Sequence, residues 1–356
     1  MDLGRVSVCV PAYNRPAMLK QLVHSFLKQD YPNKELVISD DSSNDQVESM
    51  VSSFTEPRIL YIRNHQNLGF AKNSYQALSQ ARGEYILLMG DDDLFLSPRA
   101  LSKYAEIFTS HLSVSYVNCN NAQFSSALEI ENIYTTFLHD TLFDAGADSM
   151  QGIWTTSIPM SGIGLRNTFE LDQFYPQENL LFPQLEYVGH VINQADSYGI
   201  AAELIGIRAH PDQLGFYAIR GERIKNTERH GTIELFAIYD RLASRYRFQG
   251  NADYLAKDLI ERYKTSMLKE KLIVGNTLVR LNYKHFCAVS LLARQSKTLR
   301  ASYWMSQVFP AWAIRVLRAL FLFQARWRNH QSFGRLQNDL ASMSSSSERD
   351  SIRDVH

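Results

Sequence analysis

The feature that most constrains the fold of this sequence is an alternation of two residue patterns along its first 120 residues, continuous apolar runs and apolar residues at helical spacing. Short, continuous apolar runs such as 6–10 and 36–38 are typical of strands that are buried on both faces. The segment after the first run has apolar residues at helical spacing, among them Leu19, Leu22 and Phe26. Alternating strands and helices predict an α/β domain with a mainly parallel sheet and helices on both faces.

The same alternation continues to residue 117. Strands are expected at 59–62, 85–89 and 114–117, and helices are expected after Gly69 and after Ser97-Pro98. Sheets of this kind bind their ligands at the carboxyl ends of the strands. The residues that directly follow each strand are therefore the candidates for a functional site.

Three consecutive carboxylates, Asp91, Asp92 and Asp93, directly follow the apolar run 85–89. Neighbouring carboxylates raise one another's pKa unless a cation relieves their repulsion. A hard divalent ion with oxygen ligands, Mn²⁺ or Mg²⁺, fits that role. Such an ion can hold a diphosphate and stabilise its charge as it leaves a sugar. The alternative interpretation is a solvated acidic turn.

A second acidic pair, Asp40 and Asp41, follows the apolar run 36–38 and is expected at the same edge of the sheet. A carboxylate there can accept the imide N–H of uracil or thymine, and Tyr13 can offer a ring face for stacking of the base. A turn that caps the following helix explains Asp40–Asp45 about equally well.

A third candidate is the segment 67–73, Asn-Leu-Gly-Phe-Ala-Lys-Asn. Gly69 permits close approach of the backbone at a helix start, and Lys72 can meet a phosphate. In isolation the segment is also explained as an ordinary loop before a helix. Because the three candidates follow consecutive strands of one sheet, each supports the others as parts of a single nucleotide pocket.

Four motifs together resemble the family 2 glycosyltransferases. They are Val6–Arg15, Ile38–Asp45, Asn67-Leu68-Gly69, and Gly83-Glu84-Tyr85 leading to Asp91–Asp93. They occur in the family's order and approximate spacing, and the resemblance covers about residues 4–120. It implies the GT-A fold, a nucleotide-diphosphate sugar donor, a divalent metal and inversion at the anomeric carbon.

The resemblance also implies roles for individual residues. The expected donor pocket consists of Pro11, Ala12, Tyr13, Asp40, Asp41, Asn67, Gly69, Lys72, Asp91 and Asp92. Within it, Asp40 or Asp41 hydrogen-bonds the base and Lys72 faces the diphosphate. Asp91 and Asp93 are the expected metal ligands, with Asp91 favoured for the ribose side.

One departure from the family concerns the catalytic base. Many members carry a Glu-Asp pair whose acid takes the proton of the acceptor hydroxyl, and no Glu-Asp pair occurs in this sequence. An inverting transfer still needs a base within hydrogen-bond reach of that hydroxyl. Glu186 is the candidate, with Glu178 in reserve, although either is also explained as a surface carboxylate. Glu186 and Asp93 are thus the expected catalytic residues, whereas His190 and His210 are expected to be structural.

The alternation fades beyond about residue 125, and the Gly- and Ser-bearing stretch 151–167 is expected to be a loop-rich wall of the active site. Farther on, Leu235, Ile238 and Leu242 recur at helical spacing. The expected domains are a catalytic domain at 1–230, with a donor-binding part at 1–120 and an acceptor-side part at 121–230, a helical extension at 231–335, and a disordered tail at 336–356.

Composition bears on partners and location. Lys plus Arg and Asp plus Glu both number 37, which gives no general reason to expect a nucleic acid. The three cysteines show no metal-type or redox-type spacing, and the first residues lack a signal-peptide pattern, so a cytoplasmic protein is expected. The basic amphipathic segment 312–328 falls short of a transmembrane helix. It either lies on an anionic inner leaflet near a lipid-linked acceptor or packs against the catalytic domain.

These features predict a glycosyltransferase that moves a sugar from a nucleotide-diphosphate donor, with UDP or dTDP favoured, to a saccharide or lipid-linked saccharide. Cell-surface polysaccharide or glycolipid assembly is the expected setting. The alternative is a non-catalytic nucleotide-sugar-binding or partner-binding subunit, which the missing Glu-Asp pair leaves open. A nucleotidyltransferase is disfavoured because the Gly-rich basic loop that usually begins such enzymes is absent.

Overall fold

The computed structural model describes residues 4–176, 180–209, 231–246 and 330–344, together with residues 260, 296–308, 310, 313 and 316. The chain divides into two compact units. The first comprises Met1–Arg208 and His330–His356, and the second comprises Ala209–Asn329.

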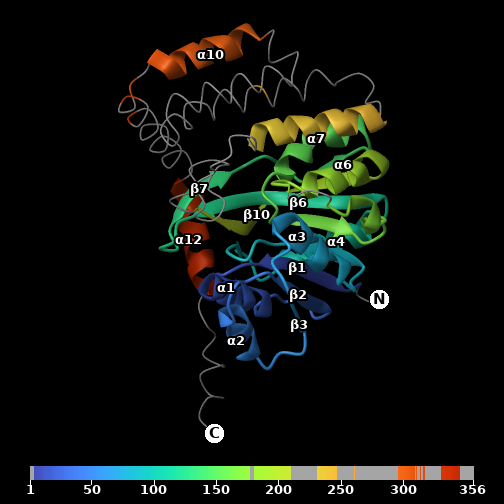
Figure 1. Ribbon diagram of the computed structural model, residues 1–356, viewed down its shortest axis with the longest axis vertical. Coiled ribbons are helices and arrows are strands. Elements are labelled where there is room, and N and C mark those ends of the chain that lie inside the picture. The colour runs from blue at the N-terminus through green and yellow to red at the C-terminus, as the bar shows by residue number, and fades with distance from the viewer. Residues whose placement is uncertain are drawn as a thin grey trace. The chain divides into compact units, whose positions relative to one another are not determined.

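A single mixed sheet organises the first unit (Figure 1). Its strands are β1 (Val6–Ala12), β2 (Lys34–Asp40), β3 (Ile59–Arg63), β4 (Tyr85–Leu88), β5 (Leu94–Phe95), β6 (Val114–Phe124), β7 (Ile130–Tyr134), β8 (Thr141–Phe143), β9 (Ile163–Arg166) and β10 (Asp196–Arg208). The order along the sheet is β3-β2-β1-β4-β9-β6-β10-β5, with β7 paired to β6 and β8 to β10. Strands β3, β2, β1 and β4 are parallel, as predicted, whereas antiparallel pairs enter beyond β4.

Helices cover both faces of this sheet. They are α1 (Pro16–Leu27), α2 (Gln46–Ser52), α3 (Phe70–Ser79), α4 (Ala100–Ser110), α5 (Ala147–Gly152) and α6 (Gln184–Gln194), with short 3₁₀ helices η1 (Trp154–Ser157) and η2 (Leu171–Phe174). The main core cluster contains Val8 and Val10 of β1 but not Cys9 between them, because successive strand residues point to opposite faces. The α/β fold class and the helix and strand positions up to residue 117 are confirmed.

The predicted loop-rich wall at 151–167 is wrong in part, because it contains the central strand β9. This strand runs antiparallel between β4 and β6. A Cβ atom at Gly164 would approach Cδ1 of Tyr104 to 2.6 Å, so the glycine permits the close packing of the tyrosine on β9. A four-residue strand that contains a glycine carries little periodic signal, which is why the sequence did not reveal it.

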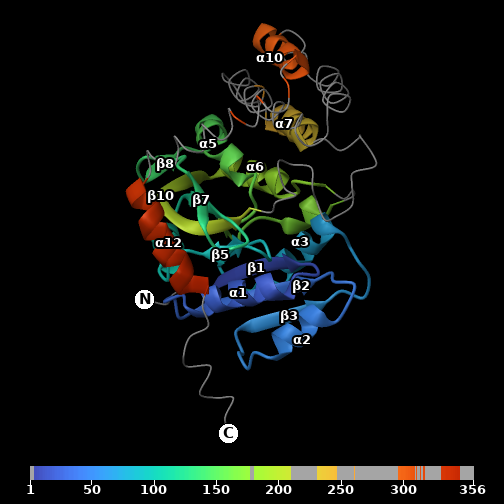
Figure 2. The ribbon, with the colours of Figure 1, turned by 90° about the vertical axis from the view of Figure 1, so that its left-hand side faces the viewer.

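Helix α12 (His330–Ser344) belongs to the first unit, where it packs against α1, β5 and β7 (Figure 2). It buries Leu336, Leu340 and Met343. The predicted disordered tail is therefore wrong for residues 336–344, because these apolar residues at helical spacing find a surface contributed by distant elements. Residues 345–356 lie outside the described residues.

In the second unit, the structure describes the helices α7 (Gly231–Tyr246) and α10 (Lys297–Val308). Helix α7 buries the predicted stripe of Leu235, Ile238, Tyr239 and Leu242. Apart from Ala313 and Val316, the basic segment 312–328 is outside the described residues, as is the predicted domain boundary at 230. Within the described parts of the chain, we find no helix with the length and apolar character needed to cross a membrane.

Candidate active site

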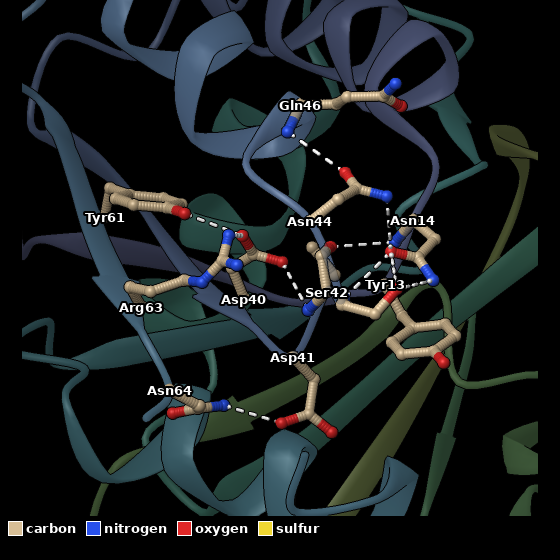
Figure 3. Close-up of polar contacts among 12 residues, drawn as sticks. Tyr13, Asn14, Asp40, Asp41, Ser42, Asn44, Gln46, Tyr61, Arg63 and Asn64 are labelled. Carbon is tan, nitrogen blue, oxygen red and sulfur yellow. Dashed lines mark hydrogen bonds and ion pairs between the residues drawn. The ribbon is translucent and has the colours of Figure 1, made fainter. Parts of the chain in front are cut away.

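The turn after β1 contacts the acidic triplet and the turn that follows the Asp40–Asp41 pair. The main-chain N–H of Tyr13 donates to Oδ2 of Asp91 at 2.8 Å. The N–H of Asn14 donates to Oγ of Ser42 at 2.8 Å, and Oδ1 of Asn14 accepts from the N–H of Ser43 at 3.0 Å (Figure 3). Asn14 has a φ of +54°, a left-handed conformation that asparagine tolerates. The ends of β1, β2 and β4 are thereby joined into one site.

Asp41 fixes the loop that precedes α3. Its Oδ1 accepts from the N–H of Leu68 at 2.8 Å and from Nδ2 of Asn64 at 3.1 Å. Its Oδ2 accepts from the N–H of Gly69 at 2.8 Å. Gly69 has a φ of +79°, which favours glycine, and Asn67 also reaches the carbonyl oxygen of Asp41 at 3.2 Å. The predicted sites at Asp41 and at 67–69 are therefore one hydrogen-bonded unit.

Asp40 lies fully buried and is oriented away from Asp41 (Figure 3). Its Oδ2 accepts from the hydroxyl of Tyr61 at 2.6 Å and from Nη1 of Arg63 at 3.0 Å. Its Oδ1 accepts from the N–H of Ser42 at 2.9 Å. Asp40 thus joins β2 to β3 and to the turn after β2. Recognition of a nucleotide base by Asp40 or Asp41 stays a prediction.

Two carboxylates of the triplet share one guanidinium. Nη1 of Arg15 lies 3.0 Å from Oδ1 of Asp91 and also donates to Oδ2 of Asp92. Burial lowers the pKa of Arg15, but the charge of Asp92, followed by that of Asp91, outweighs this effect and raises it above its usual value. Arg15 directly precedes α1, so the first strand and the first helix together position the counter-charge of the triplet.

Asp93 is held by β10 and by the segment before β9. Its Oδ1 accepts from the N–H of Arg208 at 2.7 Å, and its Oδ2 accepts from the hydroxyl of Ser161. Burial, followed by the charge of Asp92, raises the pKa of Asp93 to about 8. Nε of Arg208 donates to the carbonyl oxygen of Asp92 at 2.8 Å, and its guanidinium lies 4.6 Å from the centre of the Phe124 ring.

The three carboxylates offer oxygen ligands of the kind that a hard divalent cation takes, and the predicted ligands Asp91 and Asp93 stay a prediction. In the part of the chain that the structure describes, no three His, Cys, Asp or Glu side chains converge as a ready metal site. Mg²⁺ commonly takes one or two carboxylates and completes its shell with substrate phosphates and water. Asp91 and Asp92 converge on the Arg15 guanidinium, and Asp91 also accepts from the N–H of Tyr13. The two oxygens of Asp93 accept from Ser161 and from the N–H of Arg208. Which of these carboxylates would hold the cation stays a prediction.

Lys72 belongs to a cluster between α3 and the region of η2. Its Nζ lies 5.7 Å from the centre of the Tyr175 ring. The neighbouring Tyr75 packs edge-on against Tyr175 and donates its hydroxyl to Oδ1 of Asp172 at 2.6 Å. Contact of Lys72 with a diphosphate stays a prediction.

Glu186 lies in the first turn of α6 and is partly exposed. The side chain of Gln184 in the same turn donates to the carbonyl oxygens of Ser157 and Ile158 at 3.2 and 3.0 Å. This start of α6 therefore packs on the segment that leads to Ser161. The role of Glu186 as base stays a prediction, and both Glu178 and His210 are outside the described residues.

Three residues of the site escaped the sequence analysis. Arg15 had a usable signal, because it is a basic residue between the first strand and the first helix, at the sheet edge where the carboxylates were predicted. Ser161 and Arg208 had none, because they lie 68 and 115 residues from Asp93 along the chain.

Comparison with known proteins confirms the resemblance that the motifs indicated. Residues 7–151 match the family described as glycosyl transferase family 2. The chain is 37% identical over 108 residues to the putative colanic acid biosynthesis glycosyl transferase WcaA of Escherichia coli K12, covering 30% of this chain and 37% of the relative. It is 30% identical over 118 residues to the E. coli UDP-Glc:alpha-D-GlcNAc-diphosphoundecaprenol beta-1,3-glucosyltransferase WfgD, covering 33% and 47%.

A third relative is the GalNAc(5)-diNAcBac-PP-undecaprenol beta-1,3-glucosyltransferase of Campylobacter jejuni, which is 33% identical over 116 residues, covering 30% of this chain and 38% of the relative. The matched chain spans less than half the length of each of these relatives. Among solved structures, S. aureus TarS 1–349 in complex with UDP-GlcNAc superposes with a TM-score of 0.59 at 17% identity, covering 85% of this chain and 89% of that one. At that identity the likeness shows the fold, which is of the GT-A type.

Proposed function

We propose, from the family 2 segment at residues 7–151, that this chain transfers a sugar from a nucleotide-diphosphate donor to an acceptor hydroxyl with inversion. One observation carries the proposal. The turn after β1 is hydrogen-bonded to the acidic triplet, through Tyr13 to Asp91, and to the residues that follow the Asp40–Asp41 pair, through Asn14 to Ser42 and Ser43. A base beside the β2 end and a diphosphate beside the β4 end would then be parts of one ligand.

The base end of the donor lies at the β1–β2 side in this proposal. Tyr13 is partly exposed and offers its ring to the base, while Pro11 and Ala12 are buried behind it. Asp41 holds the 67–69 loop as a wall of the pocket through the N–H groups of Leu68 and Gly69. We favour a uracil or thymine base, and therefore a UDP-sugar or dTDP-sugar as the donor.

The diphosphate end lies at the triplet. Asp91 and Asp92 would hold a divalent cation, Mn²⁺ or Mg²⁺, which supplies a Lewis acid that stabilises the departing diphosphate when it is bound. Asp93, held by Ser161 and by the N–H of Arg208, fixes the loop that presents these two carboxylates. Lys72 of α3 would meet the diphosphate.

For the acceptor we propose a saccharide or a lipid-linked saccharide, with Glu186 as the group that takes the proton of its hydroxyl. The printed names of the E. coli and C. jejuni relatives describe glucosyl transfer to undecaprenol-linked saccharides, which supports this class of acceptor. Assembly of a cell-surface polysaccharide or glycolipid at the cytoplasmic face of the membrane is the corresponding setting.

Calorimetry of the full chain with UDP, GDP, dTDP and CDP, each with and without Mn²⁺, tests the donor site first. We expect one nucleotide to bind far more tightly with Mn²⁺ than without it. Transfer or hydrolysis of the matching nucleotide-sugar is then followed by release of the nucleoside diphosphate. No nucleotide binding under any condition would overturn the proposal, whereas binding without turnover with any acceptor tried would favour the non-catalytic nucleotide-sugar-binding subunit.

A further inference from the structure

Arg15 contacts the triplet through a single nitrogen, Nη1, which faces both Asp91 and Asp92. Its side chain is 27% exposed, whereas those of Asp91 and Asp92 are 9% and 12% exposed. The pair of carboxylates is thus largely withdrawn from water, and the guanidinium is the more accessible partner. A positive group in this position stabilises the charged form of the carboxylates, as a bound cation would.

The guanidinium can leave without displacing Asp91 and Asp92, because other donors hold both residues in place. The main chain of Arg15 is fixed between β1 and α1, which starts at Pro16, so its side chain is the part that can move. Asp91 keeps the bond from the N–H of Tyr13, and the main chain of Asp92 keeps the bond from Nε of Arg208.

We propose that Arg15 is an exchangeable counter-charge of the donor site. Its guanidinium offsets part of the negative charge of Asp91 and Asp92 in the donor-free protein, and it moves to the diphosphate when the divalent cation takes over the two carboxylates. The inference rests on the proposed function, because the cation and the diphosphate are those of the donor. A planar guanidinium binds phosphate oxygens in a bidentate manner, so the released side chain has a suitable partner.

This exchange has a measurable consequence for the order of binding. A cation that arrives alone has to displace Arg15, which then loses its partners, so free Mn²⁺ binds weakly. A cation that arrives with a diphosphate gives Arg15 a new partner, so nucleotide and Mn²⁺ strengthen one another's binding. Arg15 is therefore a positioning residue that couples the two ligands.

Titration of the full chain with Mn²⁺, followed by the electron paramagnetic resonance signal of free Mn²⁺, tests the exchange in the absence and presence of UDP. In Arg15→Gln we expect free Mn²⁺ to bind about tenfold more tightly or better, the scale on which a nearby charge changes proton binding to a carboxylate. We also expect UDP to enhance Mn²⁺ binding less in this variant than in the wild type. Arg58→Gln is the matched control, because Arg58 pairs with Glu56 outside the site.

Arg15→Lys, which keeps the charge but loses the planar fork, should keep weak binding of free Mn²⁺ and lose part of the enhancement by UDP. It also provides the measurement if Arg15→Gln does not fold. Unchanged or weaker Mn²⁺ binding in Arg15→Gln, with UDP still bound, would overturn the inference and leave the proposed function standing. Failure of the wild type to bind any of the four nucleotides would instead overturn the proposed function, and the inference with it.

Discussion

The Asp40–Asp41 pair and the Asp91–Asp93 triplet follow the two strands that flank β1, yet their carboxylates meet different kinds of partner. The first pair is bound mainly by neutral donors, namely the N–H groups of Ser42, Leu68 and Gly69, the amide of Asn64 and the hydroxyl of Tyr61, with Arg63 as its cation. The triplet accepts from the N–H groups of Tyr13 and Arg208 and from Ser161, and two of its carboxylates also share the Arg15 guanidinium.

This difference separates a permanent structural role from an exchangeable one. Main-chain N–H groups cannot leave without unfolding the loops that carry them, so the first pair holds the pocket in shape. In the proposed exchange the partly exposed Arg15 side chain moves away, so the triplet can pass from one cation to another. The comparison therefore predicts that substitutions at Asp41 act chiefly on stability and substitutions at Asp92 chiefly on turnover.

The largest expected effect is on catalysis in Asp92→Asn. Loss of one of the two carboxylates for the divalent cation should lower turnover of the nucleotide-sugar by about 100-fold or more, as removal of one electrostatic stabiliser of a transition state does. The measurement is release of nucleoside diphosphate with Mn²⁺, with Asp45→Asn, an exposed acid after β2, as the matched control. Full turnover in Asp92→Asn would remove the distinction between the clusters.

A second prediction concerns the free energy of unfolding of Asp41→Ala. The variant removes the acceptor of the N–H of Leu68, while the N–H of Gly69 keeps Oδ1 of Asn67 and the amide of Asn64 keeps Oδ1 of Asn73. Because an unsatisfied buried donor costs about 1–3 kcal/mol, we expect a loss of about 2 kcal/mol in urea unfolding. A variant as stable as the wild type but unable to bind nucleotide would show that Asp41 serves the ligand rather than the scaffold.

The pH dependence of stability should single out Asp93. Its pKa is about 8 in the folded protein, while an aspartate in an unfolded chain titrates near 4. Unfolding then releases a proton between these values, so the free energy of unfolding falls as the pH rises from about 4 to about 8. In metal-free urea unfolding, the Asp93→Asn variant should lose this slope and gain stability relative to the wild type toward pH 8. Parallel curves for the two proteins would contradict the raised pKa.

The smallest effect is expected in Tyr61→Phe. This variant removes one neutral donor from Asp40, which keeps Arg63 and the N–H of Ser42. We expect a loss of about 1 kcal/mol in the free energy of unfolding, with turnover unchanged. Thermal unfolding and nucleoside diphosphate release on the same preparation measure both, and a large fall in turnover would show that the first pair also takes part in the reaction.

Local patterns in the sequence were sufficient for the donor half of the fold. Between β1 and α4, continuous apolar runs alternate with segments of helical period, and β3, β2, β1 and β4 pair in parallel, as the mainly parallel sheet was predicted to do. The same patterns placed Asp41 and Asp91 at strand ends. They could not show that Asp41 binds the 67–69 loop, because hydrogen-bond partners depend on the orientation of each side chain.

Beyond residue 125, sequence periodicity was not a sufficient guide. Strand β9 is short and contains Gly164. It is a central strand because its backbone pairs with both β4 and β6. Helix α12 has few apolar residues, and it is stabilised because α1, β5 and β7 together form the surface that buries Leu336 and Leu340.

The sequence by itself determined the alternating α/β order, the strand ends that carry the acidic clusters, and the family 2 character of residues 7–151. These properties reside in short stretches of chain, where side-chain period and residue type are read locally. Only the tertiary structure decided which cation faces the triplet, that Ser161 and Arg208 hold Asp93, and that α12 belongs to the first unit. The physical reason is that counter-charges and burial come from residues far apart in the chain, and folding alone brings them together.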